Sequence, residues 1–422
     1  MKFIHAADIH LDSPLIGLYR YEEAPVEEIR GATRQAFKNL IELAIAESVD
    51  FVLIAGDLYD GDWKDYRTGL FLAAQMAKLR ESDIQVFIIA GNHDAESRIT
   101  KYIRMPDNVK MFPAKKPDSI PISDSIVVHG QGFTSRAVYE DLSVNYPDHW
   151  PGYFNIGLLH TSADGREGHD PYAPCTLQGL LSKNYDYWAL GHVHKREILH
   201  EEPLVLFPGN IQGRYIREVG NKGCTLVIEQ DGKMISAEHH DLDVLRWSIC
   251  RIDAARAVTG DEVLDHIESA LREKLDQSEG RSLAIRIEVI GACKAHNDLS
   301  LNIDHWINNI YAIANDLSKG QIWIEKVGFK TQLSANLTEI IGRNDPLGSL
   351  IRTISNNDEK KQELVDFTHM FDDLHRKLPS ELRSGDDPID LQSPETFRSA
   401  IEDVKQLLLT RILTKGMTSE NS

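Results

Sequence analysis

The chain has 422 residues, of which 42% are hydrophobic and 26% charged, and its formal net charge is −19. This is the composition of a globular protein long enough for more than one domain, and it excludes a low-complexity chain. The negative charge counts against a protein that coats nucleic acid nonspecifically, because such a chain has no overall attraction for a polyanion. It does not count against enzymes whose acidic side chains hold metal ions, since the ions cancel that charge locally.

The N-terminal stretch does not have the pattern of a signal peptide, because His5, Asp8 and His10 interrupt its apolar residues. No run of ~18 apolar residues occurs, so we expect no membrane span. The cysteines form no CxxC pair, which favours reduced, buried thiols in a cytoplasmic protein. They are Cys175, Cys224, Cys250 and Cys293.

The first half of the chain alternates short apolar strands with amphipathic helices. Strands are predicted at 2–7, 51–55 and 85–90, and helices at 30–48 and 66–80. Strand–helix alternation of this kind indicates an α/β layered core.

Closely spaced strands follow a connection at 115–125 that is rich in Pro, Asp and Ser. They are predicted at 125–129, 154–160, 187–190, 204–207 and 224–229. The short spacing of the last three predicts antiparallel pairing. Asp231-Gly232, between two apolar runs, is typical of a hairpin turn. We assign residues 1–242 to this first domain.

The second half begins after a break near residues 240–246. A strand–helix–strand–helix–strand pattern then predicts a small α+β domain over 245–342; its elements are expected at 247–252, 261–275, 283–290, 303–317 and 321–329. Residues 345–415 have the amphipathic, charged character of a helical segment, and we expect 416–422 to be a disordered tail.

Five short polar motifs each follow an apolar strand. In chain order they are Asp8-Ile9-His10, Gly56-Asp57-Leu58-Tyr59-Asp60, Gly91-Asn92-His93-Asp94, Gly157-Leu158-Leu159-His160 and Gly191-His192-Val193-His194. Open α/β sheets place ligands at the carboxyl ends of their strands, so we expect the five motifs to converge on one rim. Any one of them alone is weak, because a lone His-x-His is usually surface or satisfied core. Five in this order predict a site.

These residue types suit hydrolysis of a phosphodiester. Two cations about 3.5–4 Å apart can activate water and neutralise the phosphoryl oxygens. A carboxylate that bridges them is required, and Asp57 is the natural candidate. Ligation by nitrogen and oxygen without thiolate favours Mn²⁺, Fe or Zn²⁺ over Ca²⁺ or Mg²⁺.

The set D-x-H, G-D-x-x-D, G-N-H-D, a strand-ending H and G-H-x-H resembles the signature of calcineurin-like metallophosphoesterases. That resemblance implies a two-sheet α/β core flanked by helices and two divalent metal ions, with Mn²⁺ the expected ion. It assigns one ion to Asp8, His10, Asp57 and His194. It assigns the other to Asp57, Asn92, His160 and His192.

The same resemblance makes His93 the catalytic histidine, near the leaving-group oxygen but not on a metal. Asp60 would orient or charge His93, and Asp94 could share that task; the simpler reading of Asp60 is an acid in the first turn of a helix. We expect His5 to be core. Approach of His129 to the site, and a role for the loop of His169 in lining a substrate cleft, remain open.

Within the superfamily, the opening residues 5–14 and the segment 207–224, with its Pro-Gly turn and its Lys222-Gly223-Cys224 strand entry, resemble SbcD-type DNA repair exonucleases. Within that group the chain resembles the bacterial YhaO branch. Serine/threonine phosphatases differ, because here no Arg follows Asp60. The resemblance implies a capping domain that presents DNA, a separate coiled-coil ATPase partner gripped by the C-terminal helices, and a homodimer. No P-loop motif occurs in this chain.

The sequence therefore predicts a two-metal DNA exonuclease or endonuclease of DNA repair, with in-line attack by a metal-bridging hydroxide. Arg214, in a loop that closely follows the last predicted ligands, is the best candidate for a phosphate contact. The alternative is a small-molecule phosphodiesterase or phosphatase with the same site, although that enzyme would not need the residues beyond the catalytic domain. The complete ligand set disfavours a non-catalytic scaffold.

Overall fold

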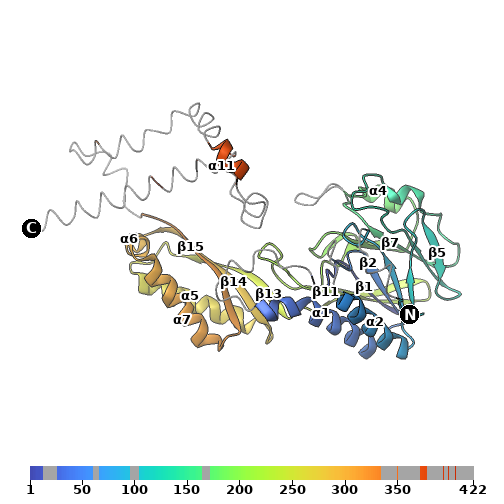
Figure 1. Cartoon of the computed structure of the whole chain (residues 1–422), viewed down its shortest axis with the longest axis horizontal. Helices are drawn as coiled ribbons and strands as arrows, with labels where there is room; N and C mark the ends of the chain where they lie inside the picture. Colours follow the sequence, from blue (N-terminus) through green and yellow to red (C-terminus); the bar gives the residue numbers. More distant parts are fainter. Residues whose placement is uncertain are drawn as a thin grey trace, which may run out of the picture. The chain divides into compact units, whose positions relative to one another are not determined.

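The computed structural model describes residues 1–12, 26–59, 66–95, 104–163, 172–333 and 371–377, with the single positions 349, 393, 398 and 404. The described chain divides into two compact units, with the division between Trp247 and Ser248 (Figure 1). The predicted helical segment 345–415 and tail 416–422 lie largely outside the described residues, apart from a short helix, α11 (Asp372–Lys377).

Two six-stranded sheets form the first unit. The first has the order β12-β11-β1-β2-β3-β4 and the second β5-β6-β7-β8-β10-β9. In the first sheet the strands are β1 (Lys2–Ala6), β2 (Phe51–Ala55), β3 (Gln85–Ile89), β4 (Val109–Met111), β11 (Gly223–Gln230) and β12 (Lys233–Asp241). In the second they are β5 (Asp118–Pro121), β6 (Ile126–Gly130), β7 (Phe154–His160), β8 (Tyr187–Gly191), β9 (Glu197–His200) and β10 (Leu204–Phe207).

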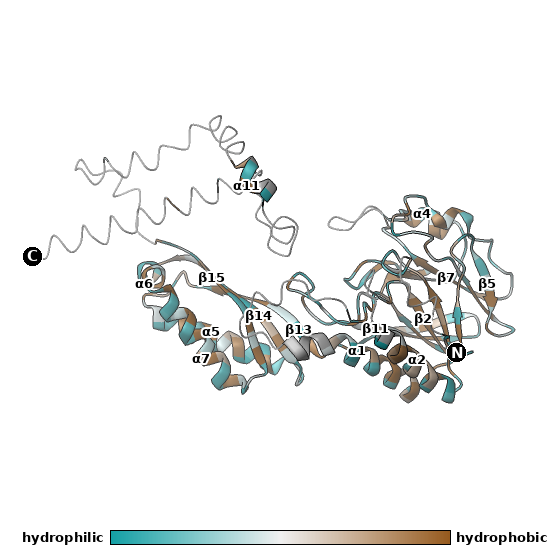
Figure 2. Ribbon diagram, viewed as in Figure 1, coloured by the Kyte–Doolittle hydropathy of each residue, from teal (hydrophilic) through white to brown (hydrophobic). Residues whose placement is uncertain are grey.

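Both faces of the first sheet are buried at its central strands, which explains why β2 is an uninterrupted apolar run and β3 is nearly one. Successive side chains point to opposite faces. Val52 and Ile54 pack with the helices α1 (Val26–Ala46) and α2 (Tyr66–Glu81), whereas Phe51 and Leu53 pack against the second sheet. Figure 1 shows the two helices side by side on the outer face, and in Figure 2 the central strands are brown.

A third apolar layer covers the outer face of the second sheet. Trp188 and Leu190 of β8 pack there with residues from a short 3₁₀ segment (Leu142–Asn145) and from α4 (Leu177–Leu181). The mixed α/β fold with two sheets and flanking helices is the architecture predicted from the sequence.

The expected antiparallel pairing of the strands at 187–190, 204–207 and 224–229 is wrong. β8 and β10 pair in parallel, and β11 belongs to the other sheet, between β1 and β12. The reason is β9, which the sequence pattern did not reveal. β9 pairs antiparallel with β10 at the sheet edge and reverses the chain between β8 and β10. The connection predicted at 115–125 also contains an edge strand, β5. The hairpin at Asp231-Gly232 joins β11 to β12 as predicted, with both residues at positive φ.

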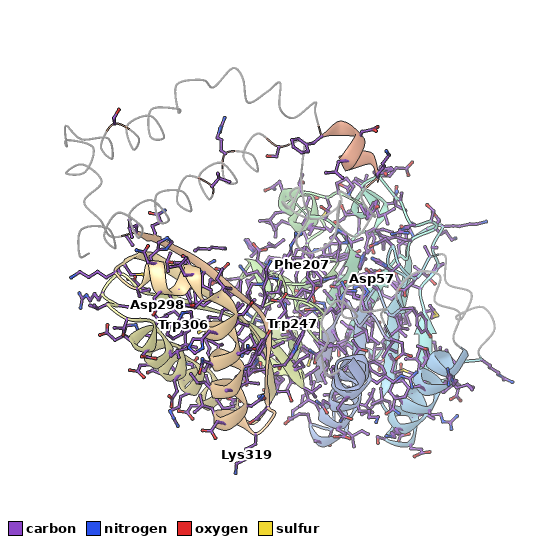
Figure 3. The ribbon with its side chains drawn as sticks, turned by 60° about the vertical axis from the view of Figure 1, so that its left-hand side comes forward. Asp57, Phe207, Trp247, Asp298, Trp306 and Lys319 are labelled. Atoms are coloured by element: carbon purple, nitrogen blue, oxygen red, sulfur yellow. The ribbon has the colours of Figure 1, made fainter. Side chains whose placement is uncertain are left out.

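The second unit is a three-stranded sheet with helices. The order is β13-β14-β15, formed by β13 (Leu245–Asp253), β14 (Ser282–Cys293) and β15 (Ile322–Leu333). β14 and β15 run parallel, so their connection must cross over, and it contains α6 (His296–Leu301) and α7 (Ile303–Ser318). With α5 (Gly260–Asp276), these helices pack on the sheet around Trp306, whose Nε1 donates to the backbone oxygen of Asp298 at 3.1 Å (Figures 1 and 3).

Candidate metal centre

The predicted ligands meet where five strands end. Asp8 and His10 follow β1, Asp57 follows β2 and Asn92 follows β3, while His160 ends β7 and His192 follows β8; β1–β3 run parallel in one sheet, and β7–β8 run parallel in the other. The carboxyl ends of both sets of strands therefore form a common rim. Both sheets contribute to it.

Glycines let the two sheets approach at this rim. A Cβ at Gly191 would lie 1.8 Å from the backbone oxygen of Ala55, and a Cβ at Gly56 would lie 2.4 Å from Nδ1 of His160. Because neither position has a side chain, Nδ1 of His160 reaches the backbone oxygen of Ala55 at 2.8 Å. The two strand ends are thus joined by a direct hydrogen bond.

Several residues of the rim have a left-handed backbone. φ is 52° at Asp8, 46° at His10, 52° at Asp57 and 105° at His192. Non-glycine residues rarely adopt such angles, and each costs of order 1–3 kcal/mol. The surrounding hydrogen bonds hold them, among them the bonds from the backbone N–H of His192 to both carboxylate oxygens of Asp8, at 3.1 Å.

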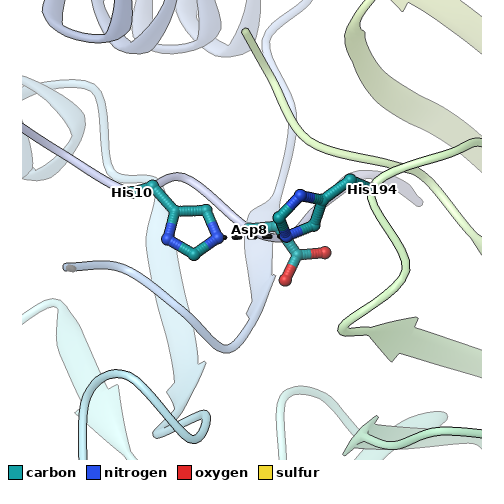
Figure 4. A group of neighbouring side chains, drawn as sticks. All are labelled: Asp8, His10 and His194. Atoms are coloured by element: carbon teal, nitrogen blue, oxygen red, sulfur yellow. Dashed lines mark hydrogen bonds between the residues drawn. The ribbon is translucent and has the colours of Figure 1, made fainter. Parts of the chain in front are cut away.

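The first group of predicted ligands consists of Asp8, His10 and His194, with one ligand atom from each within 4.8 Å of the others (Figure 4). Nε2 of His10 lies 3.1 Å from Nε2 of His194. Nε2 of His10 also lies 3.9 Å from Oδ2 of Asp57. The structure therefore gathers the four residues predicted for one ion.

Asp57 also belongs to the second group. Its Oδ2 lies 3.5 Å from Nε2 of His160, which is 3.0 Å from Oδ1 of Asn92. The ring of His192 stands edge-on to that of His160, with centroids 5.2 Å apart. Asp57 therefore has contacts in both groups.

The chemistry of this cluster fits divalent cations. Nδ1–H of a neutral His160 donates to Ala55, so Nε2 carries its lone pair toward the oxygens of Asn92 and Asp57. The two imidazoles of the first group likewise face each other through Nε2. Nitrogen and oxygen lone pairs that converge in this way repel one another unless a positive charge lies among them.

The pKa values of the rim residues also indicate that the cluster favours a bound cation. Burial would lower the pKa of His160, but the carboxylates of Asp57 and Asp8 outweigh it and raise that pKa to about 9. Burial would raise the pKa of Asp57, yet His160, His10 and His93 hold it well below its usual range. Burial is the main cause that raises the pKa of Asp8. The rim thus favours a bound positive charge.

His93 and Asp94 lie in the loop after β3. The backbone N–H of His93 donates to Oδ1 of Asp57 at 3.0 Å, and its ring is edge-on to His10 with centroids 5.1 Å apart. The Asp94 carboxylate accepts the backbone N–H groups of Leu58, Tyr59 and Gly91 at 3.1, 2.9 and 3.0 Å. Asp94 therefore ties together the loops that carry Asp57 and His93. Asp60 lies outside the described residues.

Other histidines separate clearly from the cluster. His5 is fully buried, with Nδ1 2.9 Å from the hydroxyl of Tyr187 and Nε2 3.1 Å from the backbone oxygen of Leu190, so it is core as predicted. His129 lies between Ser119 and Asn155 and does not join the candidate metal groups. His169 lies outside the described residues.

Sequence reasoning missed Glu218. Its Oε1 lies 2.6 Å from Nδ1 of His194 and 3.4 Å from Nη2 of Arg214. The predicted phosphate contact, Arg214, is thus placed beside the cluster and pairs with Glu218. Nothing in the motif pattern marks a glutamate 24 residues beyond His194, because only the folded loop brings the two together.

Comparisons with known proteins give two family matches. The calcineurin-like phosphoesterase family matches residues 1–196, and the middle domain of metallophosphoesterase YhaO matches residues 247–332. In the described part of the chain, every helix is too short or too polar to cross a membrane.

Among curated proteins, the uncharacterised metallophosphoesterase YhaO of Bacillus subtilis (strain 168) is 36% identical over 299 residues, which is 69% of this chain and 72% of that protein. The DNA double-strand break repair protein Mre11 of Sulfolobus acidocaldarius is 22% identical over 391 residues, 88% of this chain and 96% of its own. Mre11 of Methanocaldococcus jannaschii is 28% identical over 207 residues, 46% of this chain and 52% of its own. The chain therefore belongs to the calcineurin-like metallophosphoesterases, metal-dependent phosphoester hydrolases with a dinuclear divalent metal site, and it carries a YhaO-type middle domain.

Proposed function

We propose that this protein is a two-metal phosphodiesterase that cleaves DNA as an exonuclease or endonuclease in cytoplasmic DNA repair. The observation that carries the proposal is the position of Asp57, 3.9 Å from Nε2 of His10 in one ligand group and 3.5 Å from Nε2 of His160 in the other. The relatives named as DNA double-strand break repair proteins support DNA as the substrate.

Each ion would have its own ligands and share Asp57. Asp8, His10 and His194 would hold one, and Asn92, His160 and His192 would hold the other. Mixed nitrogen and oxygen donors fit Mn²⁺, Fe or Zn²⁺, and of these we propose Mn²⁺. When bound, such a pair of ions neutralises charge on the phosphate and lowers the pKa of the attacking water.

His93 is the proposed proton donor to the departing oxygen. It is less buried than its neighbours His10 and Asp57, so its ring can meet a substrate at the rim. The hydrogen bond from its backbone to Oδ1 of Asp57 fixes the loop, and Asp94 fixes the same loop from the other side at Gly91. Asp60→Asn tests the remaining proposal that Asp60 orients His93: loss of turnover with an altered pH profile supports it, and unchanged kinetics exclude it.

The rest of the chain has proposed roles in handling DNA. Residues 245–342 would present DNA to the rim, and residues 345–415 would bind a coiled-coil ATPase subunit; we also propose a homodimer. A small-molecule diesterase would need neither segment, and the match to a dedicated middle domain at 247–332 supports the larger substrate.

The deciding experiment is cleavage of end-labelled linear DNA with Mn²⁺, in parallel with hydrolysis of bis(p-nitrophenyl) phosphate. His93→Asn and His192→Ala are the inactive controls. DNA cleavage that both substitutions abolish supports the nuclease. Hydrolysis of the small diester with intact DNA, also after addition of candidate ATPase partners, would instead favour the small-molecule enzyme.

A further inference from the structure

The loop after β10 supports the loop that carries His192 and His194. Gly209 has φ 80°, and a Cβ there would lie 3.0 Å from the backbone oxygen of His194. The Nζ of Lys222, which is buried, donates to that same oxygen at 2.8 Å. The backbone of His194 is therefore held by a loop outside the five motifs.

Glu218 is the charged centre of this loop. Its side chain is only 5% exposed, and donors surround both of its oxygens. Oε2 accepts Nδ2–H of Asn210 and the backbone N–H of Arg214, both at 2.8 Å. Oε1 faces Nη2 of Arg214 at 3.4 Å and Nδ1 of His194 at 2.6 Å.

These donors fix the carboxylate in place, and the N–H groups and the guanidinium around its two oxygens favour its ionised form. An ionised carboxylate is acceptor-only, so the atom that faces it on a neutral His194 must be Nδ1–H. Nε2 of His194 is then the lone-pair nitrogen, and it is the atom 3.1 Å from Nε2 of His10.

We propose that Glu218 is a positioning residue that holds His194 in the Nδ1–H tautomer and so presents Nε2 as a basic metal ligand beside Asp8 and His10. A carboxylate behind a ligating histidine fixes the ring and raises its basicity. His160, in the other group, donates its Nδ1–H to the neutral backbone oxygen of Ala55. Of these two histidines, therefore, only His194 has a carboxylate at Nδ1.

This inference rests on the metal centre of the proposed function but not on DNA as the substrate. Its test is the affinity for Mn²⁺ of the wild type, Glu218→Ala and Glu218→Gln. Electron paramagnetic resonance of the free ion measures that affinity. Loss of a carboxylate behind a ligand typically weakens metal affinity about 10–100-fold. We expect that loss at one of two sites in Glu218→Ala, and a smaller loss in Glu218→Gln, which keeps one acceptor oxygen without the charge.

The matched control is Glu325→Gln in the second unit. Glu325 is also 5% exposed, and Arg286 binds both of its oxygens, so the control removes an equally buried carboxylate remote in sequence from the five motifs. It should leave Mn²⁺ affinity unchanged. Unchanged affinity in folded Glu218→Ala, or an equal loss in Glu325→Gln, would overturn the proposal.

A second readout needs no substitution of Glu218. Imidazole ¹⁵N–¹H correlation spectra of the metal-free wild type, with His194 assigned by His194→Gln, report the tautomer of the neutral ring directly. We expect Nδ1–H. A neutral His194 with its proton on Nε2 would overturn the proposal. If Mn²⁺ binds as expected but DNA stays intact, the nuclease proposal fails while the role of Glu218 stands.

Discussion

Two clusters of buried charge differ in how their charges are balanced. In the second unit, Arg286 of β14 donates to both oxygens of Glu325 of β15, at 2.7 and 2.6 Å. At the rim of the first unit, the carboxylates of Asp8 and Asp57 lie among imidazole nitrogens. The first arrangement is a matched donor–acceptor pair, whereas the second is rich in lone pairs. Balanced pairs of this kind hold a fold together, and convergent lone pairs are the chemistry of a metal site.

The largest expected effect is on catalysis, from Asp8→Asn. Ionised Asp8 is costly in the metal-free fold, because burial raises its pKa. We therefore expect the substitution to leave the free energy of unfolding of the metal-free protein unchanged or higher, and to lower diester hydrolysis more than about 100-fold by loss of a ligand. Chemical denaturation and bis(p-nitrophenyl) phosphate hydrolysis measure the two quantities.

Glu325→Gln should show the opposite pattern. It leaves the guanidinium of Arg286, 16% exposed, with a poorer partner, and we expect a loss of about 3 kcal/mol in unfolding free energy with hydrolysis retained. If Asp8→Asn also destabilised the metal-free protein by that amount, the proposed difference in charge balance between the two clusters would be wrong.

Two glycine substitutions test the difference between the two units by adding a methyl group to each. A Cβ at Gly91 would lie 2.2 Å from Oδ1 of Asp57, and a Cβ at Gly260 would lie 2.2 Å from the ring of Trp306. Gly91→Ala should displace Asp57 and lower Mn²⁺ affinity at least tenfold. Gly260→Ala should cost about 1–3 kcal/mol of stability and leave Mn²⁺ affinity intact. Equal effects of the two on metal binding would argue against a local role for the loop of Asp57.

His5 gives a pH-dependent contrast within the first unit, because it is a buried histidine outside the cluster. Burial lowers its pKa from 6.5 to about 3, opposed by its hydrogen bond to Leu190. The unfolded chain then binds the proton more readily, so the contribution to stability is complete above pH 6.5 and is lost as pH falls toward 3. At pH 5 the loss is about 2 kcal/mol.

His5→Gln should abolish this part of the pH dependence. Chemical denaturation at pH 7 and pH 5 gives the change in unfolding free energy between the two pH values for wild type and variant. The difference between these two changes is the contribution of His5, because the contributions of other groups cancel. A wild-type stability change between the two pH values no larger than that of His5→Gln would show that His5 does not stay neutral in the fold.

The smallest expected effect is that of Arg214→Ala on DNA binding. Arg214 lies beside the cluster, with Nη2 3.4 Å from Oε1 of Glu218, and a guanidinium is a geometric match for phosphate oxygens. One lost phosphate contact lowers the salt slope of binding by about one. Binding measured over a range of KCl concentrations reports that slope, and an unchanged slope would exclude the contact.

Much of the fold could be predicted because local pattern determines it. The strand at 154–160 is found as Phe154–His160, and the helix at 66–80 is found as Tyr66–Glu81. The pairing of β8 with β10 could not be predicted, because the intervening β9 is short and half-exposed and lacks the apolar signal of its neighbours.

The site also has a part that local pattern predicts and a part that it does not. The motif residues are brought together because each follows a buried strand, and strand ends at one rim are a consequence of the topology. Glu218 escaped prediction because it reaches His194 through an irregular loop that no periodicity encodes. Its role follows only from the distances and burial in the folded protein.

The most direct test of the account is a crystal of the protein soaked with Mn²⁺ and measured for anomalous scattering. We predict two peaks at the rim with the carboxylate of Asp57 between them, one beside His10 and His194 and the other beside Asn92 and His160. No peak at the rim of a protein that hydrolyses the diester under the same conditions, or peaks ligated by other residues, would contradict the account.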